Sequence, residues 1–280
     1  MYYTLNELRP KEHYFETDVV TCDIKGGLGN QLFMLCATLA FAKRYGKIAW
    51  FEYPSHYGSR SSYWTTLFQP FVHDRRGPIQ HRYQENGFAF HAIPQDSDYL
   101  DGYFQSELYF KDQIDLIRTE MNITQHQERM KQRYPISPQS ISLHLRIGDY
   151  VSLPNHHPIQ TEDYYLRCMQ LLTTSIPHPT VYCFYEQGDK DRASHVITRL
   201  QASYHGNYIH VNDSLQDWEE MILMSCCDHH IISNSSFSWW GAYWNTSPSK
   251  IVCYPSRWFG SAIAHDTKDL CPPEWTRIES

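Results

Sequence analysis

The feature that most constrains the fold is a regular alternation of short apolar runs with helix-like segments between residues 141 and 254. The runs are rich in β-branched and aromatic residues, which favours strands. We predict five strands, over residues 141–147, 180–185, 207–211, 229–233 and 250–254.

Helix signals separate these runs. Thr161 and Ser214 are typical N-cap residues, each followed by apolar residues at helical spacing. Strands that alternate with helices of this length favour a doubly wound parallel sheet. We predict helices over residues 162–174, 190–204, 215–226 and 237–245.

The N-terminal half begins with a similar unit. A strand over 18–24, a glycine-rich turn, a helix over 30–45 and a strand over 47–53 form a predicted βαβ unit. No element is predicted within residues 54–110, which are irregular and aromatic. The leader of 17 residues has no predicted role.

A polar helix over 111–132 and a proline-containing linker over 133–138 follow. The sequence therefore predicts two α/β domains, 1–136 and 137–280. Open α/β sheets bind ligands at the carboxyl ends of their strands, so we expect the active site in a cleft between the two domains.

The charge balance disfavours one class of partner. The chain has 24 Lys and Arg against 31 Asp and Glu, a formal net charge of −7. A polyanion such as nucleic acid is therefore disfavoured, whereas a small phosphorylated ligand needs only a few local cations. An aromatic content of 15% suits a protein that stacks sugars, although a core rich in Tyr and Trp is the commoner explanation.

The eight cysteines form no C-x-x-C pair and have no histidine at metal-ligand spacing. We read them as small core residues of a reduced protein. The N-terminus lacks an apolar signal region, and no run of about 18 apolar residues is long enough to span a bilayer. We therefore expect a cytoplasmic protein with no integral membrane segment, from a microbial or viral source.

The first candidate motif is Lys25-Gly26-Gly27-Leu28-Gly29-Asn30, between a predicted strand and helix. Glycines there permit positive φ and let a ligand approach the backbone beside the helix N-terminus. The order matches neither a dinucleotide fingerprint nor a P-loop. A tight turn without a ligand is the alternative.

The second motif is His144-Leu145-Arg146-Ile147-Gly148-Asp149-Tyr150, at the end of a predicted strand. Strand alternation places His144 and Arg146 on one face. The Arg146 guanidinium has the geometry to hold a diphosphate through two hydrogen bonds. The alternative is an Arg146–Asp149 ion pair with a structural role.

The third motif, residues 231–242, runs from a strand through Asn234, Ser235 and Ser236 into a helix. The serine hydroxyls and the helix N–H groups are suited to bind phosphate. The alternative is that one serine only caps the helix. Trp239 and Trp240 are expected to pack in the core.

Taken in this order, GGLGNQLF, HLRIGDY and NSSFSWWGAYWN resemble the α1,2-fucosyltransferases, glycosyltransferase family 11. The similarity extends to LDGYFQSELYF at residues 100–110 and covers the chain from about Asp18 onward. The resemblance implies a GT-B-type fold of two Rossmann-like domains facing each other across a cleft. It also implies inverting transfer of L-fucose from GDP-β-L-fucose to the 2-hydroxyl of a terminal galactose.

The resemblance also implies roles for individual residues. Arg146 corresponds to the arginine that contacts the diphosphate, and Asn30 lies where the glycine-rich loop faces the reacting sugar. Catalytic roles are thereby expected for Arg146, Asn30 and Asp149. The expected donor-binding set is Gly27, Gly29, His144, Arg146, Glu186, Glu220, Asn234, Ser235, Ser236 and Phe237.

Two positions depart from the family pattern. Where relatives carry Ser-Asp-Asp after a strand, this chain has Glu186, which we expect to read guanine. Glu220 replaces an aspartate. No D-x-D motif is present, so we expect catalysis without a metal or other cofactor, with Arg146 and the helix after Asn234 stabilising the leaving group.

The general base and the natural acceptor stay open at this point. Asp23, His144, Asp149 and Glu107 are candidates for the base, and acceptor recognition is expected within residues 54–110. The alternatives for function are an α1,6 or α1,3 linkage, another GDP-sugar donor, or a non-catalytic protein that binds glycans or nucleotides.

Overall fold

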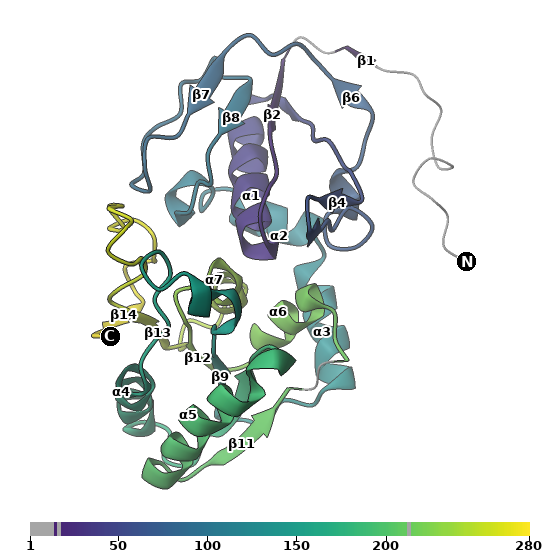
Figure 1. The fold of residues 1–280 in the computed structure, drawn as a ribbon. Coiled ribbons are helices and arrows are strands. Elements are labelled where there is room, and N and C mark those ends of the chain that lie inside the picture. Colours follow the sequence, from purple (N-terminus) through teal and green to yellow (C-terminus); the bar gives the residue numbers. More distant parts are fainter. Residues whose placement is uncertain (1–13, 16–17, 212–213) are drawn as a thin grey trace. The chain divides into compact units, whose positions relative to one another are not determined.

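The computed structural model describes residues 14–15, 18–211 and 214–280 (Figure 1). The chain divides into two compact units, residues 1–122 with 268–270, and residues 123–267 with 271–280. The sequence placed the boundary later, at 136/137. Helix α3 (Ile123–Arg133) belongs to the second unit because it packs against α6 (Asp217–Met224). The Gln127 side chain fixes this packing by donating to Ser225 Oγ at 2.8 Å.

The second unit contains a six-stranded sheet in which every neighbouring pair is parallel. The strand order is β11-β10-β9-β12-β13-β14. The strands are β9 (Ser140–His144), β10 (Thr180–Phe184), β11 (Asn207–His210), β12 (His229–Ile231), β13 (Val252–Pro255) and β14 (Thr276–Ile278).

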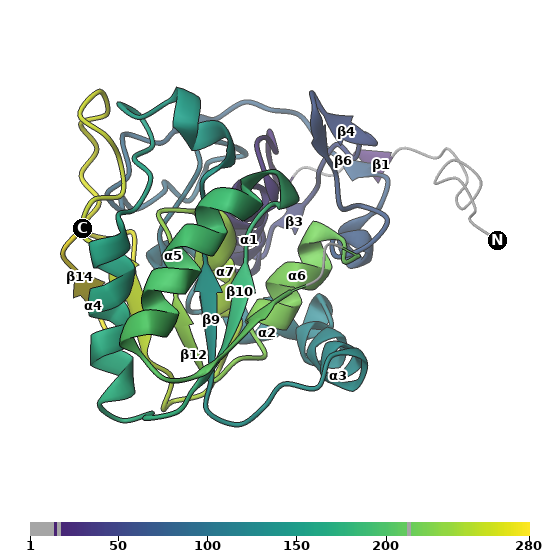
Figure 2. The same cartoon turned by 60° about the horizontal axis from the view of Figure 1, so that its bottom comes forward.

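Numbered within the unit, this order is 3-2-1-4-5-6, that of a doubly wound fold. Strands β10 and β11 are added on one side of β9, and β12, β13 and β14 on the other. The carboxyl ends of β9 and β12, where the strand order changes side, therefore form the topological switch point. Helices α4 (Glu162–Thr173) and α5 (Lys190–Ser203) lie on one face, and α7 (Ser236–Tyr243) lies on the other (Figure 2). Helix α6 packs against α7.

The predicted alternation in this unit is confirmed, with shorter strands than expected. Strand β9 ends at His144, so Arg146 lies beyond the strand. Helix α6 is capped by Gln216 with Glu219 in a capping box, whereas the sequence suggested Ser214. Strand β14 was not predicted, because only three residues at the end of the chain form it.

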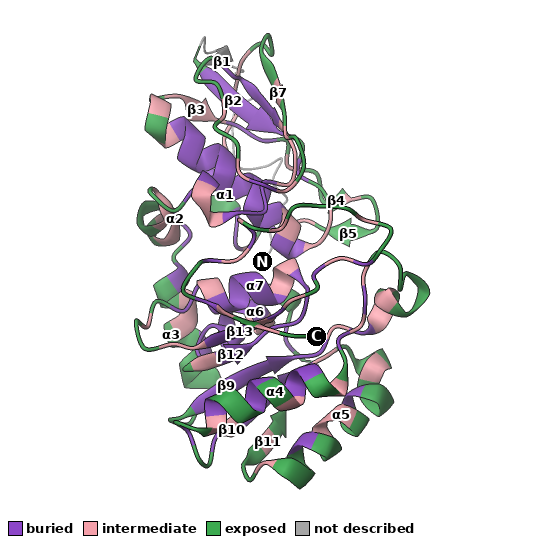
Figure 3. Cartoon of the chain, turned by 90° about the vertical axis from the view of Figure 1, so that its left-hand side faces the viewer, coloured by how far each residue is buried: buried purple, intermediate pink, exposed green. Residues whose placement is uncertain are grey.

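The first unit has a smaller parallel sheet, in the order β3-β2-β8-β7. Its members are β2 (Val19–Cys22), β3 (Ile48–Ala49), β7 (Arg82–Gln84) and β8 (Tyr99–Asp101). Helix α1 (Leu28–Tyr45) connects β2 to β3 and is almost entirely buried (Figure 3). The carboxyl ends of β2 and β8 form the switch point of this sheet.

Short elements complete the first unit. Strand β1 (Tyr14–Phe15) pairs with β6 (Arg75–Arg76), and β4 (His56–Tyr57) pairs with β5 (Arg60–Ser61). The single helix predicted over 111–132 is wrong. Helix α2 (Ile114–Glu120) ends before Asn122, whose φ of 55° cannot continue a helix, and α3 follows it.

The expectation of an α/β fold with parallel sheets is confirmed for both units. Seven of the eight cysteines are buried and all are free thiols, as the sequence suggested. Trp239 and Trp240 pack in the core, as expected. Among the described residues, no helix is both long and apolar enough to cross a bilayer. The face-to-face arrangement of the domains stays a prediction.

Candidate active site

In the second unit, Arg146 is the centre of a charged cluster just beyond the end of β9. Its Nη2 lies 2.5 Å from Asp149 Oδ1, and its Nη1 donates to Glu186 Oε1 at the end of β10. The guanidinium lies 5.3 Å from the centre of the Tyr150 ring. The ion pair with Asp149, one of the two readings of the sequence, is therefore present, and Glu186 adds a second carboxylate.

The cluster keeps Arg146 charged although its side chain is only 20% exposed. Burial alone lowers the pKa of a guanidinium, because it removes the charge from water. The carboxylates of Glu186 and Asp149 outweigh that effect, so the pKa of Arg146 is raised. The structure thus places one largely buried cation, Arg146, and two more exposed carboxylates, Asp149 and Glu186, at the switch point.

Tyr150 and Gly148 belong to the second motif but were given no individual role, and their hydrogen bonds fix this loop. Tyr150 donates its hydroxyl to the Asn234 carbonyl at 3.0 Å, which ties the loop after β9 to the loop after β12. Burial raises the pKa of Tyr150 to about 12, so the phenol keeps its proton. The Gly148 N–H donates to Asp189 Oδ2 at 2.7 Å. These contacts join segments that are 41 and 84 residues apart, so no local sequence pattern predicts them.

His144 is buried at the end of β9 and faces α7. Its Nδ1 lies 2.8 Å from Ser233 Oγ, and its ring lies 5.6 Å from the ring of Phe237. Burial and then the charge of Arg146 lower the pKa of His144 to about 3. The imidazole is therefore neutral at physiological pH.

The segment after β12 anchors two neighbouring loops through Asn234 and caps helix α7 through Ser235. Asn234 donates from Nδ2 to the carbonyls of Pro158 and Trp258, each at 3.0 Å. Its buried Oδ1 has no hydrogen-bond partner in the described part of the chain. Ser235 caps α7 by accepting from the Phe237 N–H at 3.3 Å, which was the structural reading of this motif.

Two further predicted donor-binding residues lie beside these. Ser236 is the first residue of α7, where helix N–H groups are available to an anion. Glu220 is half-buried on α6, which packs against α7. The structure thus brings Arg146, Asp149 and Glu186 into one cluster, and His144, Ser233 and Phe237 into another beside it.

The first unit carries the glycine-rich loop. The positive φ is at Gly26, +79°, where a Cβ would lie 2.9 Å from Asn30 Nδ2. Gly27 has an ordinary φ of −74° as the N-cap of α1, and Gly29 is already inside that helix. Space is open beside the Gly27 Cα. Gly26 is therefore required by the backbone, and Gly27 leaves room for a ligand.

Asn30 is held from the other side of this switch point. Its Oδ1 accepts from Gln105 Nε2 at 2.8 Å, and Gln105 lies on the loop after β8. Sequence reasoning did not identify Gln105 as a site residue. The quoted stretch at 100–110 contains it, but only the pairing of β2 with β8 brings it to Asn30.

Charged groups surround the same sheet end. Asp101 pairs with Lys25 at 3.6 Å and with Arg82 at 2.8 Å. Asp23 is exposed after β2, and burial together with a hydrogen bond to Asp23 raises the pKa of Tyr99. Glu107 opens a short 3-10 helix after the same loop.

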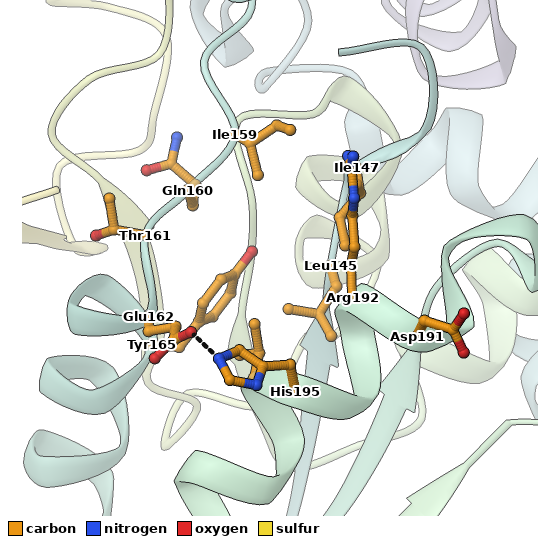
Figure 4. Close-up of a pocket in the computed structure, with 11 residues that line it drawn as sticks. Leu145, Ile147, Ile159, Gln160, Thr161, Glu162, Tyr165, Asp191, Arg192 and His195 are labelled. Carbon is orange, nitrogen blue, oxygen red and sulfur yellow. Dashed lines mark ion pairs between the residues drawn. The ribbon is translucent and has the colours of Figure 1, made fainter. Parts of the chain in front are cut away.

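A separate pocket of about 610 Å³ lies on the opposite side of β9, between α4 and α5 (Figure 4). Leu145 and Ile147, which alternate with His144 and Arg146, line its wall. Glu162 and His195 form an ion pair at its edge, 2.9 Å apart. None of the predicted site residues lines this pocket.

Comparison with known proteins gives relatives of one kind. An alpha-1,2-colitosyltransferase of Escherichia coli is 32% identical over 186 residues, 64% of this chain and 61% of the relative. The O-antigen biosynthesis glycosyltransferase WbnK, also of E. coli, is 29% identical over 181 residues, 62% of this chain and 56% of the relative. The chain thus spans about six tenths of the length of these curated relatives.

Among solved structures, Arabidopsis thaliana FUT1, the R284K mutant in complex with GDP, aligns with a TM-score of 0.48 at 12% identity. The alignment covers 86% of this chain and 71% of that one. The family model for glycosyl transferase family 11 matches residues 71–279, which include the Arg146 cluster and the segment after β12. This chain belongs to glycosyl transferase family 11.

Proposed function

We propose that this chain is an inverting glycosyltransferase that moves L-fucose from GDP-β-L-fucose to the 2-hydroxyl of a terminal galactose. Membership of family 11 supports the reaction class. The observation that carries the proposal is Arg146, a permanently charged fork held at the switch point of a doubly wound sheet.

The donor diphosphate would replace the carboxylates around Arg146. Asp149 and Glu186 are 45% and 61% exposed, so both can swing into solvent without leaving a buried charge. The guanidinium would then bind two phosphate oxygens, and the N-terminus of α7 would add N–H groups. Glu186, once released, is free to accept from the N1–H and amino groups of guanine.

The leaving group gains negative charge as the bond to the anomeric carbon breaks. Arg146 would stabilise that charge in a partly buried site, where electrostatic interactions are stronger than in water. The acceptor hydroxyl attacks from the side opposite GDP, which inverts the configuration. No metal is required in this scheme.

The general base is best sought in the first unit. A pKa of about 3 makes His144 a weak base. Asp149 lies beside Arg146, on the side where the leaving diphosphate would bind, whereas the acceptor hydroxyl attacks from the opposite side. Asp23 and Glu107 both lie near the sheet end that carries Asn30. We propose that one of them accepts the proton of the acceptor hydroxyl.

A second candidate donor has support of its own. The relative that is 32% identical is named as an alpha-1,2-colitosyltransferase, so we propose GDP-colitose as the second candidate donor for this chain. The linkage would be the same, and the same residues would stabilise the leaving GDP.

The test is GDP release in the presence of EDTA, with GDP-L-fucose or GDP-colitose and with or without lactose or N-acetyllactosamine. We expect release that the galactoside stimulates, and an α1,2 linkage in the product by NMR. Arg146→Ala should abolish release, while Arg167→Ala, an exposed control on α4, should not. No transfer from either donor to any galactoside would contradict the proposal.

A further inference from the structure

The loop after β8 is clamped by a carboxylate from the neighbouring strand. Glu85 directly follows β7, and its carboxylate accepts from the backbone N–H of Tyr103 at 2.7 Å and of Phe104 at 3.0 Å. The residue is partly buried, and that burial raises its pKa against the opposing effect of these two hydrogen bonds. A surface side chain with no structural task would not bury its carboxylate in this way.

The chain is shaped to accept this clamp. Gly102 lies so close to Glu85 that a Cβ there would be 2.3 Å from Glu85 Cβ. Phe104 adopts a φ of 52°, a left-handed conformation that is costly for a bulky residue. Its side chain is fully buried, with the rings of Tyr83 and Tyr109 at 6.4 and 5.1 Å. Strain of this kind persists only where the surroundings enforce it.

The consequence of the clamp is the placement of Gln105. The residue is 7% exposed and donates from Nε2 to Asn30 Oδ1 at 2.8 Å. This bond fixes the orientation of the Asn30 amide, because it holds Oδ1 toward Gln105 and Nδ2 away from it. Within the described residues, Asn30 Nδ2 has no acceptor. It lies over the glycine turn, near the position that a Gly26 Cβ would occupy.

We propose that Gln105, held in place by Glu85, is a positioning residue that orients the Asn30 amide so that Nδ2 donates to an oxygen atom of the substrate. The oxygen belongs to a hydroxyl of one of the two reacting sugars, because GDP itself is assigned to the second unit. This inference rests on the proposed transferase function, and it assigns Asn30 the role of a hydrogen-bond donor. The Asn30 oxygen already accepts from Gln105, so Nδ2 is the atom of this amide that is assigned to the substrate.

The main test is a double-mutant cycle on transfer by the full-length protein. We expect Asn30→Ala to lower kcat about 10²-fold and Gln105→Ala about tenfold, because small misplacements of a reacting group are costly. If Gln105 acts through Asn30, the double variant should resemble Asn30→Ala. A double variant about tenfold slower than Asn30→Ala would overturn the proposal.

Two controls separate positioning from general loss of structure. Gln113→Ala removes a glutamine of the same segment that donates to Asp112 instead, and it should keep wild-type kcat. GDP affinity should be unchanged in Gln105→Ala, so that the loss lies in kcat. Asn30→Asp retains the acceptor for Gln105 but has no N–H, and it should be as slow as Asn30→Ala. A fast Asn30→Asp variant would contradict the donor role.

A readout without catalysis keeps this inference separate from the proposed function. In ¹⁵N-labelled protein, the Asn30 side-chain amide resonance is identified by its loss in Asn30→Asp. It should shift in Gln105→Ala and in Glu85→Gln, and stay in Gln113→Ala. If the wild type transfers no sugar, the proposed function fails and this measurement still decides whether the Glu85–Gln105–Asn30 arrangement exists. An unchanged resonance in both variants would overturn it.

Discussion

The two units hold their candidate site residues by different physical means. In the second unit, Arg146 is held by opposite charge, between Asp149 and Glu186. In the first unit, Asn30 is held by a neutral hydrogen bond from a loop that carries backbone strain. A fixed positive charge stabilises an anionic leaving group, whereas a fixed amide orients a neutral reacting group such as a sugar hydroxyl. Under the proposed function, we expect the second unit to bind and activate the donor and the first unit to orient the reacting groups.

The largest expected effect is that of Arg146→Ala. Loss of a preorganised charge at a developing anion costs about 10²–10³ in kcat. Arg146→Lys should be intermediate, since it keeps the charge but not the fork. Steady-state transfer assays would check both. Full activity in Arg146→Ala would contradict the role of Arg146 in stabilising the leaving group.

Acid should weaken the second unit first. His144 and His230 are both buried there, and burial lowers the pKa of each. Below the unfolded pKa of 6.5, the unfolded chain takes up protons that the folded chain refuses until about pH 3 for His144. Stability therefore falls as pH falls from 6.5, by about 2 kcal/mol for His144 between pH 7 and pH 5.

Hydrogen exchange at pH 7 and pH 5 would check this difference between the units. Peptides from β9 and β12 should lose more protection than peptides from α1, and His144→Gln should reduce the change. Equal loss in both units would show that the acid sensitivity lies elsewhere.

A matched pair of glycines tests the glycine-rich loop of the first unit. Gly26→Ala should destabilise the protein by about 1–2 kcal/mol, because an L-residue at its φ of +79° is strained. Gly27→Ala should keep the melting temperature, since its φ of −74° is ordinary and its surroundings are open. Slow transfer by a stable Gly27→Ala variant would support ligand contact there, and wild-type transfer would argue against it.

The smallest expected effect concerns the carboxylates of the second unit. Glu186→Gln removes a competitor of the diphosphate but also the charge that would read guanine. We expect GDP affinity to fall by less than about tenfold, while UDP affinity stays or rises, because only guanine offers the N1–H and amino pair. Calorimetry with both nucleotides would check this. Equal changes for GDP and UDP would contradict a guanine-reading role.

The sequence predicted the second unit better than the first for a physical reason. Strands β9 and β10 and helix α4 bury apolar side chains at regular spacing, so the periodicity is visible in the sequence. His144 is the last residue of β9, and Arg146 and Asn234 lie two and three residues beyond the ends of β9 and β12, so their positions follow from the same pattern. The ion pair of Arg146 with Asp149 was one of the two predictions for this motif, since arginines at strand ends often have a structural role.

The first unit could be read only in part. Strands β7 and β8 have three residues each and lie in a segment where no element was predicted. Glu85, which follows β7, contacts the loop after β8 at Gly102, Tyr103 and Phe104, which are 17 to 19 residues away in the sequence. The pair Gln105–Asn30 spans 75 residues, so no local pattern reveals it. Likewise, the partners of Arg146 at Glu186 and of Tyr150 at Asn234 depend on strand order.

The most direct test of this division between the units is GDP binding by calorimetry to the wild type, Arg146→Ala and Asn30→Ala. GDP carries the leaving group but no sugar. The account predicts that Arg146→Ala binds GDP at least about tenfold more weakly, while Asn30→Ala binds it as the wild type does. Wild-type GDP affinity in Arg146→Ala, or its loss in Asn30→Ala, would contradict the assignment of the donor nucleotide to the second unit.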